Sequence, residues 1–407
     1  MTHAYIYMEC PLTQATVTLG RLSIQNGKGA FRYSPEALEQ RFWVPDPVRF
    51  PLQDREFVVT KNDGVPGFIL DAMPDGWGER LLGRLHGSRL SKIELLLKSP
   101  NTDRSGGIMS GTSRHPPAAV GQKGIRPLEA KFLDAFLLAC QAIYDSSLTT
   151  EQIEALKIRD QRSSAGGARP KRTFRGNQML ILAKPKDKYD DHDFPAIEHA
   201  CMSFAGSKGL NVAKTSLHIG KEVKTLLVER FDRVYNAKTD HFHRVPMLSA
   251  LTLLNAEWKS ADHSDWHYAA FANELYRRGA AEDRPELFKR MAYNALVGNA
   301  DDHPRNHAVI WQAGRWRLSP MYDVMPILGE GPAQTLSMAV GRQGTAITRA
   351  NMLSECQHFG LTEEAAAAIL DEVASWDNEL KTYYGAFLAG ADLDAAVAAV
   401  SGARLRA

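Results

Sequence analysis

The stretch Gly298-Asn299-Ala300-Asp301-Asp302-His303-Pro304-Arg305-Asn306-His307, with the dipeptide Tyr322-Asp323 downstream, decides how this chain is interpreted. Asp301 precedes Asn306 by five positions, and Asp323 follows after a short apolar passage. Kinases place the aspartate that accepts the proton of the substrate hydroxyl five residues before a magnesium-holding asparagine, and a second magnesium aspartate follows. The spacing therefore indicates a phosphoryl-transfer site, with Asp301 as base and with Asn306 and Asp323 as magnesium ligands.

Two other interpretations of this stretch compete with the kinase. Asp301 and Asp302 could cap a turn, because Asp and Asn commonly serve turns. Alternatively, Asp302, His303 and His307 could bind zinc, since histidines four positions apart share one helical face in zinc enzymes. Pro304 disfavours a helix at this point, and no glutamate adjoins His303. Zinc is therefore disfavoured, and His303 is expected to order the loop around Asp301.

The segments on either side of the stretch favour the kinase over the simple turn. Residues 285–297 place apolar side chains at helical spacing, so a helix is expected to lead into the loop. Residues 308–311 and 315–318 are apolar or alternating, and they flank Ala313-Gly314, which predicts a β-hairpin. This hairpin would carry the chain from Asn306 to Asp323, as the chemistry requires.

An upstream region has the order of a kinase small lobe. A basic, glycine-containing loop at 163–171 precedes an apolar strand at 179–184 that ends in Lys184, and a helix at 195–208 carries Glu198. A second apolar strand covers 223–231. Backbone amides of such a loop could hold phosphates, with Lys184 reaching them and Glu198 orienting Lys184. Glycine pairs also occur in ordinary turns, and both charged side chains could simply face water.

Two further groups of residues in this region have open roles. Glu229 and Phe231 stand where a hinge strand would contact adenine, although Phe231 could equally belong to a plain core. Several cations crowd the loop and could bind nucleotide phosphates, bind a phosphorylated serine, or face water. These cations are Arg162, Arg169, Lys171, Arg172 and Arg175.

Composition limits the class of protein. The chain has 407 residues, 44% hydrophobic and 24% charged, with a net charge of +2. These values are typical of a globular protein of two or three domains, and the near balance argues against a strong duplex-DNA binder. The four cysteines are scattered, and no signal peptide or membrane-spanning run is apparent. We expect reduced, buried thiols, no membrane association and a cytoplasmic protein.

The chain is expected to adopt an α+β, bilobal, protein-kinase-like fold in three parts. An accessory α/β subdomain would cover 1–125, the small lobe with the glycine loop 126–240, and a helical C-terminal lobe with the catalytic loop 241–407. The first boundary follows from the Gly-, Ser- and Pro-rich segment 107–127, which has little periodicity.

Six motifs together make the chain resemble the HipA family of serine/threonine kinase toxins from type II toxin-antitoxin modules. They occur in the family's order over nearly the whole chain. The motifs are Gly20-Arg21-Leu22 with Phe31-Arg32-Tyr33-Ser34-Pro35, Met73-Pro74-Asp75-Gly76-Trp77-Gly78, Ser164-Ala165-Gly166-Gly167-Ala168-Arg169-Pro170-Lys171, Val228-Glu229-Arg230-Phe231-Asp232-Arg233, Asn299 to His307, and Tyr322-Asp323. Two departures are the paired glycines, where some members have one, and segment 107–127, which has no counterpart.

The resemblance implies ATP and Mg²⁺ as cofactors and a specific set of site residues. Asp301 would be the catalytic base, assisted by Asn306 and Lys184, and Mg²⁺ would be held by Asn306 and Asp323. The nucleotide-binding set would be Ser164, Gly166, Gly167, Lys184, Glu229, Phe231 and His303. Ser164, or alternatively Ser163, would be the autophosphorylation site that switches the kinase off.

The resemblance also implies partners. They are a HipB-type antitoxin with a helix-turn-helix, operator DNA bound mainly through that antitoxin, and a protein substrate of the aminoacyl-tRNA synthetase class. An alternative function is a catalytically inactive module that binds the antitoxin as a corepressor. The intact set Lys184, Asp301, Asn306 and Asp323 favours the active kinase.

Overall fold

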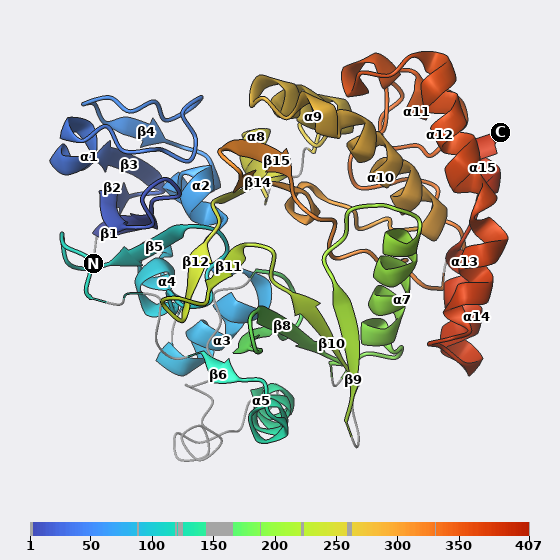
Figure 1. Ribbon diagram of the computed structural model, residues 1–407, viewed down its shortest axis with the longest axis horizontal. Helices are drawn as coiled ribbons and strands as arrows, with labels where there is room; N and C mark the ends of the chain where they lie inside the picture. The colour runs from blue at the N-terminus through green and yellow to red at the C-terminus, as the bar shows by residue number, and fades with distance from the viewer. Residues whose placement is uncertain are drawn as a thin grey trace. The chain divides into compact units, whose positions relative to one another are not determined.

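The computed structural model describes residues 3–87, 89–118, 120, 125–143, 166–187, 189–220, 224–258, 263–329 and 331–406. The chain forms two compact units (Figure 1). The first unit combines Met1–Tyr189 with Val228–Leu248, and the second combines Asp190–Leu227 with Ser249–Ala407. The expected boundaries near residues 125 and 240 stay predictions, since each unit is built from segments that are not continuous in sequence.

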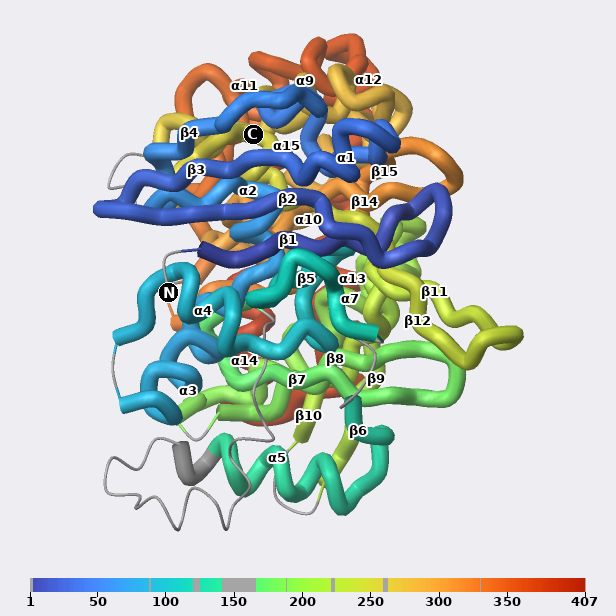
Figure 2. The backbone as a smooth tube through the Cα atoms, turned by 90° about the vertical axis from the view of Figure 1, so that its left-hand side faces the viewer, coloured from blue at the N-terminus to red at the C-terminus, as the bar shows by residue number. Residues whose placement is uncertain are grey.

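The first unit begins with an antiparallel sheet ordered β4-β3-β2-β1-β5 (Figure 2). Its strands are β1 (His3–Glu9), β2 (Thr16–Gln25), β3 (Lys28–Tyr33), β4 (Phe57–Val59) and β5 (Ile108–Gly111). The β2–β3 hairpin turns at Asn26-Gly27, which both have positive φ (51° and 73°). An Asn-Gly pair adopts this left-handed turn readily, so the sequence sets the hairpin locally.

Strand β5 is a difference from the sequence-based expectation. The little periodicity of segment 107–127 gives no sign of a strand, yet β5 pairs antiparallel with β1, with Met8 opposite Ile108 and Tyr5 opposite Gly111. Only four residues form this edge strand, and two of them are serine and glycine, so the alternation is too short to detect. The first part of the segment therefore completes the N-terminal sheet.

Short helices cover this sheet. They are α1 (Pro35–Glu39), α2 (Gly67–Leu70), α3 (Gly76–His86) and α4 (Lys92–Lys98). Ser34 caps α1 through the amide of Ala37, and Ser91 forms a capping box with Glu94 at the start of α4. Phe31 packs edge-on against Phe68 at 5.4 Å in the core. Local capping chemistry therefore explains where α1 and α4 begin.

A second five-stranded sheet has the order β6-β7-β8-β10-β9. Its strands are β6 (Arg126–Pro127), β7 (Arg172–Arg175), β8 (Leu180–Pro185), β9 (Thr215–Ile219) and β10 (Lys224–Glu229). Helix α5 (Ala130–Ile143) precedes β7, helix α7 (Phe194–Ser207) follows β8, and a β11–β12 hairpin (Arg233–Asn236 and His241–Arg244) follows β10. The predicted order of loop, strand, helix and strand is thus present.

Helices dominate the second unit. Helices α8 (Ala250–Leu253), α9 (Tyr268–Arg277) and α10 (Arg284–Val297) precede the hairpin of β14 (Ala308–Gln312) and β15 (Arg315–Leu318), which joins a small sheet with β13 (Met247–Ser249). Helices α11 (Arg349–Leu353), α12 (Glu363–Ser375), α13 (Asp377–Tyr384), α14 (Gly390–Ala399) and α15 (Ala403–Arg406) follow. Leu287, Phe288 and Met291 of α10 are fully buried. Helix α10, labelled in Figure 1, is therefore the central helix on which the candidate site is built.

These observations confirm the predicted α+β fold class. All four cysteines are free and buried, as expected from their spacing. Among the helices of the described residues, none combines the length and the apolarity that a membrane crossing requires.

Candidate active site

The loop with the deciding sequence starts where α10 ends. Gly298 caps the helix with φ of 77°, and a Cβ at this position would lie 2.9 Å from the carbonyl oxygen of Ala399. Glycine is therefore required both by the left-handed backbone and by the close approach. The chain then passes through one short 3-10 turn, Pro304–Asn306, into β14.

The backbone of this loop is held from four other segments of the second unit. The hydrogen bonds run from Ile327 N to Gly298 O (3.0 Å), from Ser337 Oγ to Ala300 O (2.7 Å), from the Tyr322 hydroxyl to Arg305 O (2.8 Å), and from Ala250 N to His307 O (2.8 Å). Loop carbonyls away from water need such partners. The loop is therefore a fixed element on which side chains can be aimed.

Asp302 anchors the loop from beneath. Its carboxylate is almost completely buried; it accepts from the Tyr268 hydroxyl and lies 2.8 Å from Nε2 of His307. The same hydroxyl accepts from Asn294 Nδ2 (3.2 Å), whose Oδ1 accepts from Asn299 Nδ2 (3.1 Å). We call Asp302, His307, Tyr268, Asn294 and Asn299 the loop anchor. Because Asp302 is occupied in this way, Asp301 remains as the carboxylate for chemistry.

The zinc interpretation finds no support among the described residues. Asp302 and His307 bind each other inside the loop anchor, whereas the ring of His303 packs edge-on against Trp258 at 4.7 Å. Within the described ranges, the residues that converge as possible metal ligands are Glu9, His241 and His243 of the first unit.

Asp301 is exposed, unlike its neighbour Asp302. Partial withdrawal of its carboxyl from water raises the pKa of Asp301; the charge of Asp323 raises it further, and His303 lowers it. The two carboxylates therefore lie close enough to repel each other. A carboxylate with an elevated pKa at the surface is a suitable acceptor for a hydroxyl proton.

Asn306 and Asp323 supply oxygen atoms beside Asp301. The side-chain amide of Asn306 donates to the carbonyl oxygen of Asp301 at 3.4 Å, which leaves the amide oxygen for another partner. Asp323 follows β15 and has φ of 61°, a strained value for a residue other than glycine. Amide and carboxylate oxygens are the donors that Mg²⁺ prefers, so this pair fits that ion.

His303 lies between these groups and a tryptophan that sequence reasoning did not single out. Burial lowers the pKa of His303, whereas Asp301, Asp323 and Asp302 raise it. Within the part of the chain that the structure describes, its Nδ1 is buried without a hydrogen-bond partner. The ring of Trp258, which packs against His303, also carries the guanidinium of Arg305 at 4.3 Å from the ring centre. An unsatisfied ring nitrogen beside two carboxylates fits the predicted contact of His303 with a bound group.

The remaining predicted residues belong to the first unit or fall outside the described ranges. Lys184 lies on β8, Glu229 ends β10 and Phe231 follows it, all half-buried. Gly166 and Gly167 open the described part of the glycine loop, whereas Ser163 and Ser164 lie outside the described residues. Glu198, the proposed partner of Lys184, is buried on α7 of the second unit, and their pairing stays a prediction.

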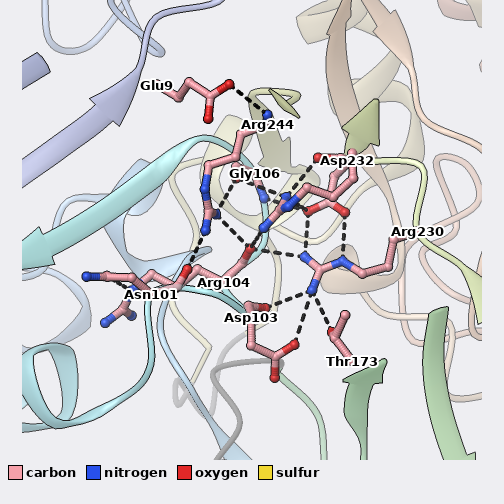
Figure 3. A network of polar contacts seen from close by, with 10 residues as sticks. Glu9, Asn101, Asp103, Arg104, Gly106, Thr173, Arg230, Asp232 and Arg244 are labelled. Carbon is pink, nitrogen blue, oxygen red and sulfur yellow. Dashed lines mark hydrogen bonds and ion pairs between the residues drawn. The ribbon is translucent and has the colours of Figure 1, made fainter. Parts of the chain in front are cut away.

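A buried ionic network fixes the segment that carries Glu229 and Phe231 (Figure 3). Arg230 grips Asp232 with Nε and Nη2 (2.9 and 2.8 Å) and reaches the carboxylate of Asp103 with Nη1 (3.2 Å). Arg233 also donates to Asp232, at 2.8 Å. The charge of the two arginines lowers the pKa of the buried Asp232 carboxyl, against the opposing effect of burial.

Sequence reasoning missed Tyr268 because its partners Asp302 and Asn294 lie 34 and 26 residues away in sequence. One signal was available for Asn294, which stands among apolar residues on the predicted helix 285–297. A polar residue on a buried helical face needs a partner inside the protein, and this marks it for attention. Two of the predicted loop cations differ from the solvated alternative, since Lys171 and Arg172 are only 7% exposed, whereas Arg162 lies outside the described residues.

Comparisons with known proteins give the family and the fold of the chain. The family model for the HipA N-terminal domain matches residues 13–103, and that for the HipA-like C-terminal domain matches residues 163–379. A chain of the Shewanella oneidensis MR-1 toxin-antitoxin complex of HipA, HipB and operator DNA superposes with a TM-score of 0.67 at 18% identity, covering 97% of this chain and 94% of that one. This likeness shows a shared fold.

Two further proteins are similar over smaller parts. The Y4mE protein of Sinorhizobium fredii, whose name suggests a kinase, is 27% identical over 156 residues, which is 37% of this chain and 36% of that protein. The Helicobacter pylori proinflammatory kinase CtkA has a TM-score of 0.42 at 12% identity, covering 57% of this chain and 86% of the other.

Proposed function

Since the chain belongs to the HipA family, we propose that it is an ATP- and magnesium-dependent protein serine/threonine kinase and the toxin of a two-protein module. One observation carries the proposal. Asp301 and Asn306 lie in one loop, and Asp323 follows the next hairpin, at the spacing of kinases. The neighbouring Asp302 is bonded within the loop anchor. This leaves one carboxylate for proton transfer and two oxygen donors for a cation.

Each residue of this set has a distinct role in the proposed reaction. Asp301 would accept the proton of the substrate hydroxyl as that oxygen bonds to the terminal phosphorus of ATP, and ADP would leave with the bridging oxygen. Asn306 and Asp323 hold Mg²⁺, which when bound neutralises charge on the phosphate oxygens. The loop anchor keeps Asp301 in position before substrate arrives, and such preorganisation lowers the barrier.

The nucleotide-binding residues are proposed from the family motifs. Lys184 and the amides of Gly166 and Gly167 would meet the phosphates, and Glu229 and Phe231 would flank the adenine. His303 would contribute its unsatisfied nitrogen. The buried Arg230–Asp232 network supports this assignment for the adenine segment, because it holds the chain on both sides of Phe231.

Ser164, or alternatively Ser163, is the proposed autophosphorylation site. A phosphate on this loop would add nearly two negative charges and strong acceptors, which can hold a loop in a new position against arginines. Arg169 and Arg172 are the described arginines nearest to Ser164 in sequence. Modification would then switch the kinase off by moving the glycine loop.

The proposed partners follow from the family and from its fold relative. That relative was solved with HipB and operator DNA, which supports a HipB-type antitoxin for this chain and operator binding through it. The net charge of +2 agrees with DNA contact made mainly by the partner. We further propose a cytoplasmic protein substrate of the aminoacyl-tRNA synthetase class.

The test uses the purified chain, radiolabelled ATP and Mg²⁺. Label should enter the wild-type protein at Ser164 or Ser163, located by peptide mass, and should be absent from Asp301→Ala. Asp302→Asn gives a second comparison, because it disturbs the loop without removing the base. Equal labelling of the wild type and Asp301→Ala would refute the assignment of the base.

A growth assay separates the kinase from the inactive corepressor. If Asp301→Ala abolishes growth arrest on expression, catalysis is the toxic activity. Arrest that persists in this variant would favour the antitoxin-binding module instead.

A further inference from the structure

The motif Met73-Pro74-Asp75-Gly76-Trp77-Gly78 has no role in the chemistry described above, yet it touches the glycine loop. Asp75 occupies the N-cap position of α3, where an aspartate normally accepts from the first amides of its own helix. Here its side chain caps none of them. Instead, the carboxylate of Asp75 accepts the backbone N–H of Gly167.

The contact is reciprocal. The amide of Trp77, one of the orphan donors at the start of α3, donates to the carbonyl oxygen of Gly167 at 3.0 Å. One turn further along, Arg80 Nη2 donates to the carbonyl oxygen of Ala168 at 2.6 Å. Three hydrogen bonds thus run between the start of α3 and two consecutive residues of the glycine loop.

The packing is so close that it requires glycine on both sides. A Cβ on Gly76 would lie 2.5 Å from the Gly167 carbonyl oxygen, and a Cβ on Gly166 would lie 2.9 Å from Asp75 Oδ1. A Cβ on Gly167, which has φ of 106°, would collide with Nζ of Lys171. The paired glycines therefore suit contact with α3 and Lys171.

We propose that Asp75 and Arg80 are positioning residues for the nucleotide-phosphate loop, which makes the first turn of α3 the clamp through which the N-terminal subdomain controls nucleotide affinity. This inference rests on the proposed kinase function. Loop amides bind phosphate well only when they are already oriented, because ordering them costs conformational entropy. A carboxylate-to-amide bond and an arginine-to-carbonyl bond are charge-assisted and among the stronger ones available.

The experiment measures two properties of the full-length protein. Hydrogen–deuterium exchange of residues 166–171 reports the clamp without nucleotide, and titration with a fluorescent ATP analogue and Mg²⁺ reports affinity. Asp75→Ala should accelerate exchange of these residues and weaken binding on the order of tenfold, the effect of losing one charge-assisted hydrogen bond. Asp75→Asn keeps an acceptor oxygen and should restore part of both losses.

Matched controls lie on neighbouring helices of the same unit. Ser91→Ala removes an N-cap from α4, so it tests whether any lost cap has the same effect. Gly76→Ala should reproduce the Asp75→Ala phenotype, whereas Gly87→Ala should not. Gly87 ends the same helix with φ of 67°, and a Cβ there would touch nothing within 4 Å.

The outcomes are distinguishable. Exchange and affinity that remain at wild-type values in Asp75→Ala would overturn the clamp, as would tighter nucleotide binding, which would make Asp75 a competitor of phosphate. Absence of nucleotide binding by the wild type would overturn the kinase proposal, and it would also overturn control of affinity by α3.

Discussion

Removal of one hydroxyl from the loop anchor should lower turnover without a matching loss of nucleotide binding. Tyr268 is completely buried, and its hydroxyl donates to Asp302 and accepts from Asn294. Tyr268→Phe leaves a buried carboxylate oxygen and a buried amide with one partner fewer. Unsatisfied buried groups cost about 1–3 kcal/mol each, so we expect about 2 kcal/mol of lost unfolding free energy.

The effect on catalysis follows from the position of Asp302 next to the base. With one of its two anchors gone, the 301–302 peptide can shift, and a displacement of about 1 Å can cost roughly 100-fold in rate. We expect kcat to fall roughly ten- to 100-fold for Tyr268→Phe, with the KM for ATP nearly unchanged, because the nucleotide contacts are not altered.

The matched control is Tyr293→Phe. Tyr293 is equally buried in the same unit and lies on α10, but its hydroxyl donates to the carbonyl oxygen of Cys201 at 2.7 Å, away from the loop. Steady-state kinetics and urea unfolding are measured for both variants. Similar stability losses with a kcat defect only in Tyr268→Phe are expected. If the two variants show the same kcat, the loop anchor has no positioning role.

Three further predictions concern stability and are tested by urea unfolding. Asp232→Ala should cost about 3–5 kcal/mol because it strands two buried arginines, whereas Asp54→Ala, which breaks a surface pair of the same 2.8 Å length, should change little. Gly298→Ala should destabilise more than Gly209→Ala: both have positive φ (77° and 81°), but only the first would meet a backbone oxygen. Burial lowers the pKa of His199 in the folded protein. The unfolded chain therefore binds more protons at His199 below about pH 6.5, so the free energy of unfolding should fall on acidification. This fall should be smaller in His199→Gln.

Much of the local structure follows from short-range chemistry and could be predicted from the sequence. The Asn26-Gly27 turn, the Ser34 cap and the hairpin after the catalytic loop each depend on residues within a few positions of one another. The base and its magnesium partners could be proposed because kinase chemistry fixes a five-residue spacing, and their roles stay predictions. For Asp301 and Asn306 the sequence spacing alone motivates the proposed roles.

The anchoring contacts could not be predicted, for a different physical reason. Tyr268 and Asp302 are 34 residues apart, and Asp75 and Gly167 are 92 apart. Which distant donor meets a buried carboxylate depends on the packed fold and not on local pattern. From the sequence, Asp302 could cap a turn or bind zinc, whereas in the structure it holds the loop through Tyr268, a partner that no spacing rule indicates.

The acidic residues of the motifs thus divide by environment and not by sequence neighbourhood. Asp301 is exposed and has a raised pKa. Asp302, the next residue, is buried, and its two carboxylate oxygens bond to Tyr268 and His307. Asp75 likewise holds a backbone amide where a helix cap was expected. An active-site loop must be rigid to stabilise a transition state, and a carboxylate bonded to buried donors provides that rigidity at a loop lacking regular structure. It follows that substitution of an anchoring aspartate should silence this protein as effectively as substitution of the base, while leaving every proposed ligand of ATP and magnesium in place.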